Sequence, residues 1–236
     1  MHTMLKMRIL YNEMRKISRR VAICMGLNDF LEHGIARGIV RYAKQQNLWN
    51  LYGYGWMFRP LEDLEYWDGD GIIARVESQE DADRLGSLSV PVVDVAGAYV
   101  HSGFYQVLND DFETGVIAGR YLKHCGFKNT AFLGVEDVGW SGKRKQGYIA
   151  GFGMPKKDLL LFEKPLSWWE ELVRSEELIS WLSALPLPLG IFACNDTAGV
   201  KLAEHCRAQK ITVPGSIAVL GVDNEDILCE IGRAHV

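Results

Sequence analysis

Two short polar segments in the second half of the sequence follow directly on apolar runs. Asn195-Asp196 follow Ile191–Cys194, and Asp223 follows Val219–Val222. Open parallel sheets bind ligands at the carboxyl ends of their strands, so polar side chains at such places are the first candidates for a binding site. Asp196 could equally cap the next helix, and an isolated Asp after a strand is commonly a turn residue. The repetition of one layout favours a shared site.

A third candidate is Arg144, which stands three residues before Gly147 near the start of a predicted helix. By itself such a string is typical of a solvated helix face. Together with the two carboxylates it suits a neutral polyol, because carboxylates accept hydrogen bonds from hydroxyls and a guanidinium donates to ring and hydroxyl oxygens. Trp140 could cover the apolar side of a sugar ring, although a tryptophan is commonly a core residue.

The elements that would position these residues alternate between strand and helix. The apolar segment Val21–Met25 predicts a buried strand, and Ile35, Ile39 and Tyr42 then recur at helical spacing, which predicts an apolar stripe packed against a sheet. Further strands are predicted at 49–56, 71–74 and 90–95, with polar helical stretches between them. Such alternation is typical of a parallel sheet covered by helices on both faces.

The same rhythm continues to the end of the chain. The acidic end of the segment 107–111 can cap a helix through Gly115 to Cys125, and a strand is predicted at 130–135. We then expect helices at 144–152, 168–185 and 198–209 and strands at 190–194 and 217–221. The predicted division is a lead-in at 1–20, a first lobe at 21–135 and a second lobe at 136–230.

Composition excludes several classes of protein. The net charge of −4 gives no basic field for a nucleic acid. The basic run at 15–20 could be a nucleic-acid arm, but it is short and favours a solvated tail, and residues 1–20 are too few for a complete helix-turn-helix domain. The five cysteines form no C-x-x-C pair, so a reducing cytoplasm fits best, with Cys24 and Cys194 as core residues. No apolar segment has the length of a membrane span or the form of an export signal.

The sequence also lacks the usual motifs of enzymes built on such sheets. No dinucleotide-binding G-x-G-x-x-G, Walker loop or G-x-S-x-G elbow occurs, and the six histidines show no metal or triad spacing. We expect a binding module without catalytic residues, metal or cofactor. The competing function is the sugar-binding protein of a transport system, which would share the fold but needs an export signal.

Four motifs occur in a fixed order along the chain. They are the string Asn109–Phe127 with its glycines at 115, 119 and 126, the R-x-x-G-Tyr string at 144–148, the Asn195-Asp196 strand end, and Gly221–Asn224. In order and spacing they resemble the periplasmic-binding-protein-like sensor domain of LacI/GalR-type regulators, over about residues 21–230. The resemblance implies a type I α/β fold, with two doubly wound parallel-sheet lobes and a ligand cleft.

Within that group the sequence is most similar to the xylose operon regulator subgroup. The stretches Trp67–Arg75 and Phe192–Asp196 and the absence of a LacI-type headpiece favour this subgroup. It implies a sugar-responsive transcription regulator with an AraC-type DNA-binding domain at its C-terminus, which is absent here, so that DNA is contacted only through that missing domain. It also implies a homodimer when the protein is full-length.

The resemblance implies a ligand and a set of ligand residues. The ligand is a pentose, with xylose as the first expectation. Carried over position by position, its ligand residues are Arg144, Asp196 and Asp223, with Asn195 nearby, and the first lobe would add Asn28 and Asp110. The segment at 28–34 departs from the more basic or aromatic loop of the relatives.

The last residues, 230–236, read like the translation of a common sequencing-library adapter. We therefore expect a reading frame that runs off a fragment, with 231–236 as a non-native tail and a C-terminally truncated fold. On that expectation the first lobe lacks its C-terminal return segments, the second lobe is incomplete, and the isolated chain has marginal stability or poor solubility.

Overall fold

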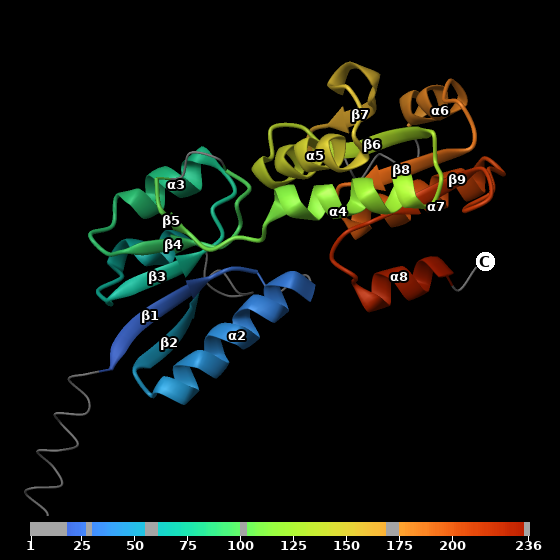
Figure 1. Cartoon of the computed structure of the whole chain (residues 1–236). Coiled ribbons are helices and arrows are strands. Elements are labelled where there is room, and N and C mark those ends of the chain that lie inside the picture. The colour runs from blue at the N-terminus through green and yellow to red at the C-terminus, as the bar shows by residue number, and fades with distance from the viewer. Residues whose placement is uncertain (1–17, 27–29, 55–60, 100–102, 169–174, 234–236) are drawn as a thin grey trace, which may run out of the picture. The chain divides into compact units, whose positions relative to one another are not determined.

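A computed structural model describes residues 18–26, 30–54, 61–99, 103–168 and 175–233 (Figure 1). The chain divides into two compact units, Met1–Leu108 and Asn109–Val236, each with a parallel sheet of its own. The predicted division after residue 135 is therefore wrong. The helix and strand that follow Leu108 pack within the second unit, because the strand pairs with two strands of the second sheet.

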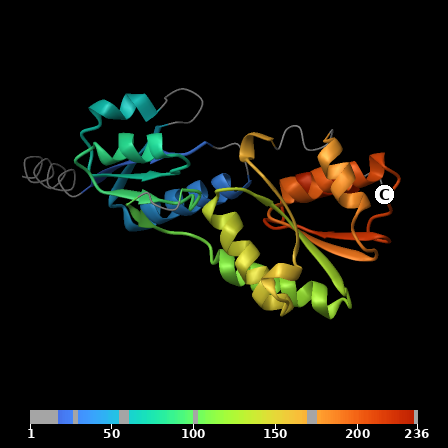
Figure 2. The same ribbon diagram turned by 90° about the horizontal axis from the view of Figure 1, so that it is seen from above.

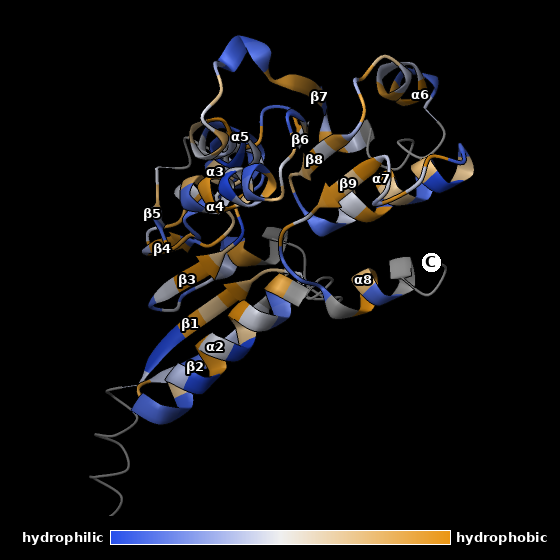
Figure 3. Cartoon of the chain, turned by 45° about the vertical axis from the view of Figure 1, so that its right-hand side comes forward, coloured by the Kyte–Doolittle hydropathy of each residue, from blue (hydrophilic) through white to orange (hydrophobic). Residues whose placement is uncertain are grey.

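The first unit has the strand order β2-β1-β3-β4-β5, with every pairing parallel. Helices α2 and α3 lie on opposite faces of this sheet (Figure 1). Orange colouring along β1 and β3 marks the hydrophobic strands that form its centre (Figure 3). The elements are β1 (Arg19–Cys24), α2 (Phe30–Gln46), β2 (Trp49–Tyr54), η1 (Leu61–Tyr66), β3 (Gly71–Ala74), α3 (Gln79–Gly86), β4 (Val92–Asp94) and β5 (Tyr105–Gln106).

The inner face of α2 differs in part from the predicted stripe. Ile35 and Ile39 are half-buried, as expected, but Ala43 takes the buried position and Tyr42 is 48% exposed. The Tyr42 ring instead meets the edge of Trp49, at 5.2 Å between ring centroids. A small residue fits close to the sheet, and the larger ring therefore lies at the rim of the helix–sheet contact.

The second unit has the strand order β7-β6-β8-β9, again all parallel. Helices α4 and α5 cover one face of the sheet, and α6 and α7 cover the other (Figure 2). The elements are α4 (Asp111–His124), β6 (Asn129–Val135), α5 (Gly139–Phe152), η2 (Lys156–Asp158), β7 (Leu160–Lys164), η3 (Leu166–Trp168), α6 (Glu176–Ser183), β8 (Leu189–Ala193), α7 (Asp196–Ala208), β9 (Ile217–Leu220) and α8 (Asp226–Arg233).

Two predicted helices have different bounds. A single helix over 168–185 is wrong: η3 ends at Trp168, residues 169–174 lie outside the described part, and α6 begins at Glu176. Ser175 starts this new helix as its N-cap, since its side chain accepts a hydrogen bond from the Leu178 amide at 3.2 Å. Helix α5 begins at Gly139, five residues before the predicted start at Arg144.

Helices α4 and α5 lie in backbone contact through four glycines. A methyl carbon built on Gly147 would be 1.9 Å from the Phe112 carbonyl oxygen, and one on Gly115 would be 2.0 Å from the Arg144 carbonyl oxygen. A methyl carbon built on Gly119 or on Gly151 would likewise lie within 2.5 Å of a backbone atom of the facing helix. Glycine at these positions therefore lets the two helices approach to a separation that no side chain permits.

The cysteines confirm the sequence prediction for Cys24 and Cys194, which are both buried. Burial raises the pKa of the Cys24 and Cys194 thiols to about 12, and that of Cys206 to about 11. The thiolate is the reactive form of cysteine. These three thiols therefore react slowly for two reasons: they are buried, and their raised pKa keeps them protonated.

We expect Cys125, which is exposed, to react fast with Ellman's reagent at pH 8 in the folded chain. Cys229 is partly exposed and should follow more slowly, while the three buried thiols should react only after unfolding in guanidinium. The measurement is the time course of thiol release with and without denaturant. Fast reaction of all five thiols in native buffer would contradict this placement of the sheets.

Across the described ranges, no helix is long and apolar enough to cross a membrane. Within the same residues, no cluster of three or more His, Cys, Asp or Glu side chains has the arrangement of a metal site.

Candidate functional site

The carboxyl ends of β6, β8 and β9 lie at one edge of the second sheet, because the three strands are parallel neighbours. Helices α5 and α7 begin at that edge, directly after β6 and β8. Three of the residues predicted from sequence, Arg144, Asp196 and Asp223, belong to the segments that start there. This is the edge at which open parallel sheets bind ligands.

Arg144 is the centre of a buried polar cluster. Its side chain is 6% exposed, and its Nε donates to Asp111 Oδ1 at 2.9 Å, where the partner side chain is 5% exposed. Its Nη1 donates to the Cys194 carbonyl oxygen, at the end of β8, at 2.6 Å. A buried guanidinium is tolerated only when a counter-charge and acceptors surround it, and both conditions are met here.

Asp223 lies at the open side of this cluster. Its Oδ1 is 3.9 Å from Arg144 Nη2, which is an ion-pair distance but too long for a direct hydrogen bond. Its backbone has φ of 107°, and Asn224 follows with φ of 52°. Positive φ at two consecutive non-glycine residues is uncommon and costs on the order of 1–3 kcal/mol per residue when the conformation is sparsely populated. The Asp223 carboxylate beside the guanidinium is thus carried on a turn of uncommon backbone conformation.

Trp140 covers the guanidinium. The Arg144 Cζ lies 5.0 Å from the centre of its ring, and the indole also packs against the hydrophobic core of the unit. A cation over an aromatic face at this distance is attracted by the ring quadrupole. In the described contacts, therefore, this tryptophan combines the core role with a role in holding Arg144.

The start of α7 differs from the expectation that Asp196 caps it. The N-cap is Asn195, whose side chain accepts from the Ala198 amide at 2.9 Å. Asp196 is the first residue of the helix and is 8% exposed. Its Oδ2 accepts from the Glu225 amide at 2.9 Å, and its Oδ1 would collide with any side chain at position 221. The glycine of the Gly-Val-Asp-Asn string thus makes room for Asp196.

Of the two candidates from the predicted first lobe, one lies in the second unit. Asp110 is exposed and is the N-cap of α4, with its side chain accepting from the Glu113 amide at 2.9 Å. This confirms the predicted acidic cap. Asn28 lies outside the described residues.

A cavity of about 900 Å³ lies within the second unit, lined by α7, β9, the turn after β9 and Cys229 of α8. Its walls are mainly apolar, with charged side chains both at the start of α7, at Asp196, and further along that helix, at Glu204 and Arg207. The lining also includes Asp223 and Asn224, and Val200, Ile211 and Val219 along the walls. A mostly apolar hollow with a few oriented polar groups is the usual form of a small-molecule site.

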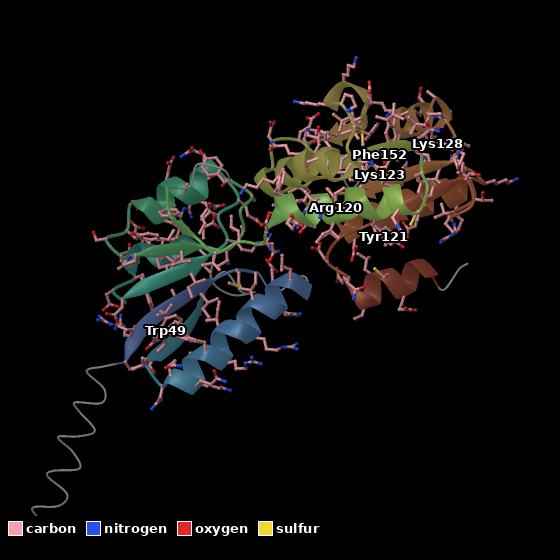
Figure 4. All side chains as sticks on the ribbon, viewed as in Figure 1. Trp49, Arg120, Tyr121, Lys123, Lys128 and Phe152 are labelled. Atoms are coloured by element: carbon pink, nitrogen blue, oxygen red, sulfur yellow. The ribbon has the colours of Figure 1, made fainter. Side chains whose placement is uncertain are left out.

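Sequence reasoning missed Asp111, which the structure places against Arg144. The signal was available, because Asp111, Gly115, Ala118 and Leu122 recur at helical spacing and form the buried face of α4. The opposite face carries the exposed Arg120 and Tyr121 (Figure 4). The Cys194 carbonyl could not be predicted, since a backbone acceptor has no signature in the sequence.

The edge of the first sheet also carries polar residues that sequence reasoning left out. Arg75, directly after β3, pairs with Glu32 at 3.3 Å and with Glu77 at 2.8 Å. Asp94 is fully buried and accepts from the amides of Val76 and Ala96 and from Gln106 Nε2. Asp94 therefore fixes the ends of three strands in this unit.

Two family descriptions match successive parts of the chain. "XylR N-terminal domain" matches residues 20–111, and "Periplasmic binding protein-like domain" matches residues 120–234. Among curated proteins, the xylose operon regulatory protein of Haemophilus influenzae is 25% identical over 226 residues, which cover 91% of this chain and 58% of that protein. The chain thus spans somewhat more than half the length of this relative.

Solved structures show the same fold. The xylose-binding transcription activator xylR superposes with a TM-score of 0.71 at 23% identity, over 89% of this chain and 55% of the other. A LacI transcriptional regulator from a Rhodococcus species gives 0.73 at 20% identity, over 92% and 82%. The predicted type I fold with two parallel-sheet lobes is confirmed, as is the resemblance to the xylose regulator subgroup.

Proposed function

Because the chain carries a periplasmic-binding-protein-like sensor domain of the xylose regulator subgroup, we propose that it senses a neutral pentose, with xylose as the first candidate. The relatives are transcription regulators, and one solved neighbour is named as xylose-binding. The proposed role of the whole protein is sugar-responsive control of transcription in the cytoplasm, as a homodimer. DNA would be contacted through a domain outside this sequence, and no catalytic step is required.

One observation carries this proposal: Arg144 Nη2 and Asp223 Oδ1 face each other across 3.9 Å at the ligand-binding edge of the sheet. The guanidinium can only donate and the carboxylate can only accept. A sugar hydroxyl does both, so one hydroxyl can accept from Arg144 while donating to Asp223. We propose Asp196 and Asn195 as the neighbouring polar groups of the same site, and Asp110 and Asn28 as further ligand residues.

Asp223→Asn is expected to weaken xylose binding about tenfold, or about 1.5 kcal/mol, the lower end of the range for a hydrogen bond to a charged group. Asparagine tolerates the positive φ of this position, so the turn should persist. The measurement is isothermal titration calorimetry on the full chain. Asp158→Asn, at an exposed site in η2, is the matched control and should bind like the parent chain. Equal affinity of Asp223→Asn and the parent would refute this placement of the ligand.

A further inference from the structure

Asp111 is the one strongly buried acid of the cluster that the ligand residues do not include. We infer that it sets the class of ligand: by neutralising Arg144, it makes the site select uncharged sugars and reject anionic ones such as aldonates and sugar phosphates. The inference rests on the proposed function, since it concerns the same site.

The charges of the cluster support this selection. Arg144 contributes one positive charge, while Asp111, Asp196 and Asp223 contribute three negative charges. The positive charge is already matched at 2.9 Å by Asp111, at a position where both side chains are almost fully buried and the local dielectric is low. An anionic ligand bound at Arg144 would therefore meet the Asp223 carboxylate at 3.9 Å from a guanidinium whose charge Asp111 already matches, and like charges repel.

The geometry of the guanidinium points the same way. Arginine binds carboxylates and phosphates best through two parallel N–H bonds from two nitrogens. Here Nε is bonded to Asp111 and Nη1 to the Cys194 carbonyl, while Trp140 covers one face. A side-on grip on an anion through Nε would have to break the bond to Asp111, and an end-on grip through Nη1 and Nη2 would have to share Nη1 with the Cys194 carbonyl. Nη2, next to Asp223, suits a single hydroxyl.

The role of Asp111 can be tested with two variants, one that changes its charge and one that changes its size. Asp111→Asn keeps the size and an acceptor oxygen but removes the charge, whereas Asp111→Glu keeps the charge and disturbs the geometry. We expect the parent chain to bind xylose at least about 100-fold more tightly than xylonate, and Asp111→Asn to reduce that ratio at least about tenfold. Asp111→Glu should leave the ratio within about threefold of the parent, even if both affinities fall. Glu113→Gln, which removes an exposed carboxylate from the same helix, should behave like the parent.

A second measurement needs no sugar. With arginine labelled by nitrogen-15, the Nε–H resonance of Arg144 should be unmoved by sulfate in the parent chain and in Glu113→Gln, and should shift with sulfate in Asp111→Asn. Absence of that shift would overturn the inference, and so would an unchanged xylose-to-xylonate ratio in Asp111→Asn. Binding of neither ligand by the parent chain would contradict the proposed function instead, while the sulfate titration would still decide the role of Asp111.

Discussion

Gly147→Ala is expected to destabilise the second unit by about 3 kcal/mol or more, because the new methyl group has no space. Its carbon would lie 1.9 Å from the Phe112 carbonyl oxygen and 2.8 Å from the Phe112 carbonyl carbon. These atoms belong to the backbone of α4, so a side-chain rotation cannot relieve the collision. Helices α4 and α5 must separate, and the contacts along their length weaken together.

Gly142→Ala on the same helix is the matched control. Apart from the adjacent residues and the helix's own backbone, no atom of the described residues lies within 4 Å of the methyl position there, so alanine should stabilise the helix by about 0.5–1 kcal/mol. Urea unfolding followed by circular dichroism measures both variants. If Gly147→Ala gained stability as Gly142→Ala should, the backbone contact between α4 and α5 would be refuted.

Arg144→Met is expected to cost about 3–5 kcal/mol of unfolding free energy. Asp111 would then be a carboxylate with 5% side-chain exposure that has lost its guanidinium partner. The Cys194 carbonyl would also lose its donor, and an unsatisfied buried acceptor adds to the cost. Urea unfolding of the purified variant measures the effect in the absence of any ligand.

The double variant Arg144→Met/Asp111→Leu tests the cause. Replacing both charges with apolar side chains removes the unpaired acid, so most of the lost stability should return. Arg120→Met, on the exposed face of α4, controls for the loss of one positive charge and should stay within about 0.5 kcal/mol of the parent. A double variant as unstable as Arg144→Met would show that the stability does not depend on the neutrality of the Arg144–Asp111 pair.

Much of the architecture could be predicted from local patterns. The strands at 71–74, 130–135 and 190–194 were found to within one or two residues, because short apolar runs bounded by turn residues are distinctive. The boundary between the units could not be found in this way. Strand 129–135 has the same appearance in either lobe, and only its pairing with β7 and β8 assigns it to the second.

The candidate site was predictable in outline for a similar reason. Polar residues after strands are visible in the sequence, so Arg144, Asp196 and Asp223 could be singled out. Which carboxylate pairs with Arg144 depends on which face of α4 is buried and on how deeply each of its residues lies in the fold. Asp110 and Asp111 are adjacent in sequence, yet one is exposed and the other is 4% exposed. A helix turns by about 100° per residue, and that rotation separates a surface cap from a buried partner.

The glycine contact between α4 and α5 also restricts how this protein can diverge. At 115, 119, 147 and 151 the backbone of the facing helix occupies the volume of a first side-chain carbon. Single substitutions by a slightly larger residue are therefore not tolerated at these four positions. A substitution there requires both helices to move apart at the same time. Distant homologues should keep these four glycines even where the exposed surfaces of the same two helices have diverged completely.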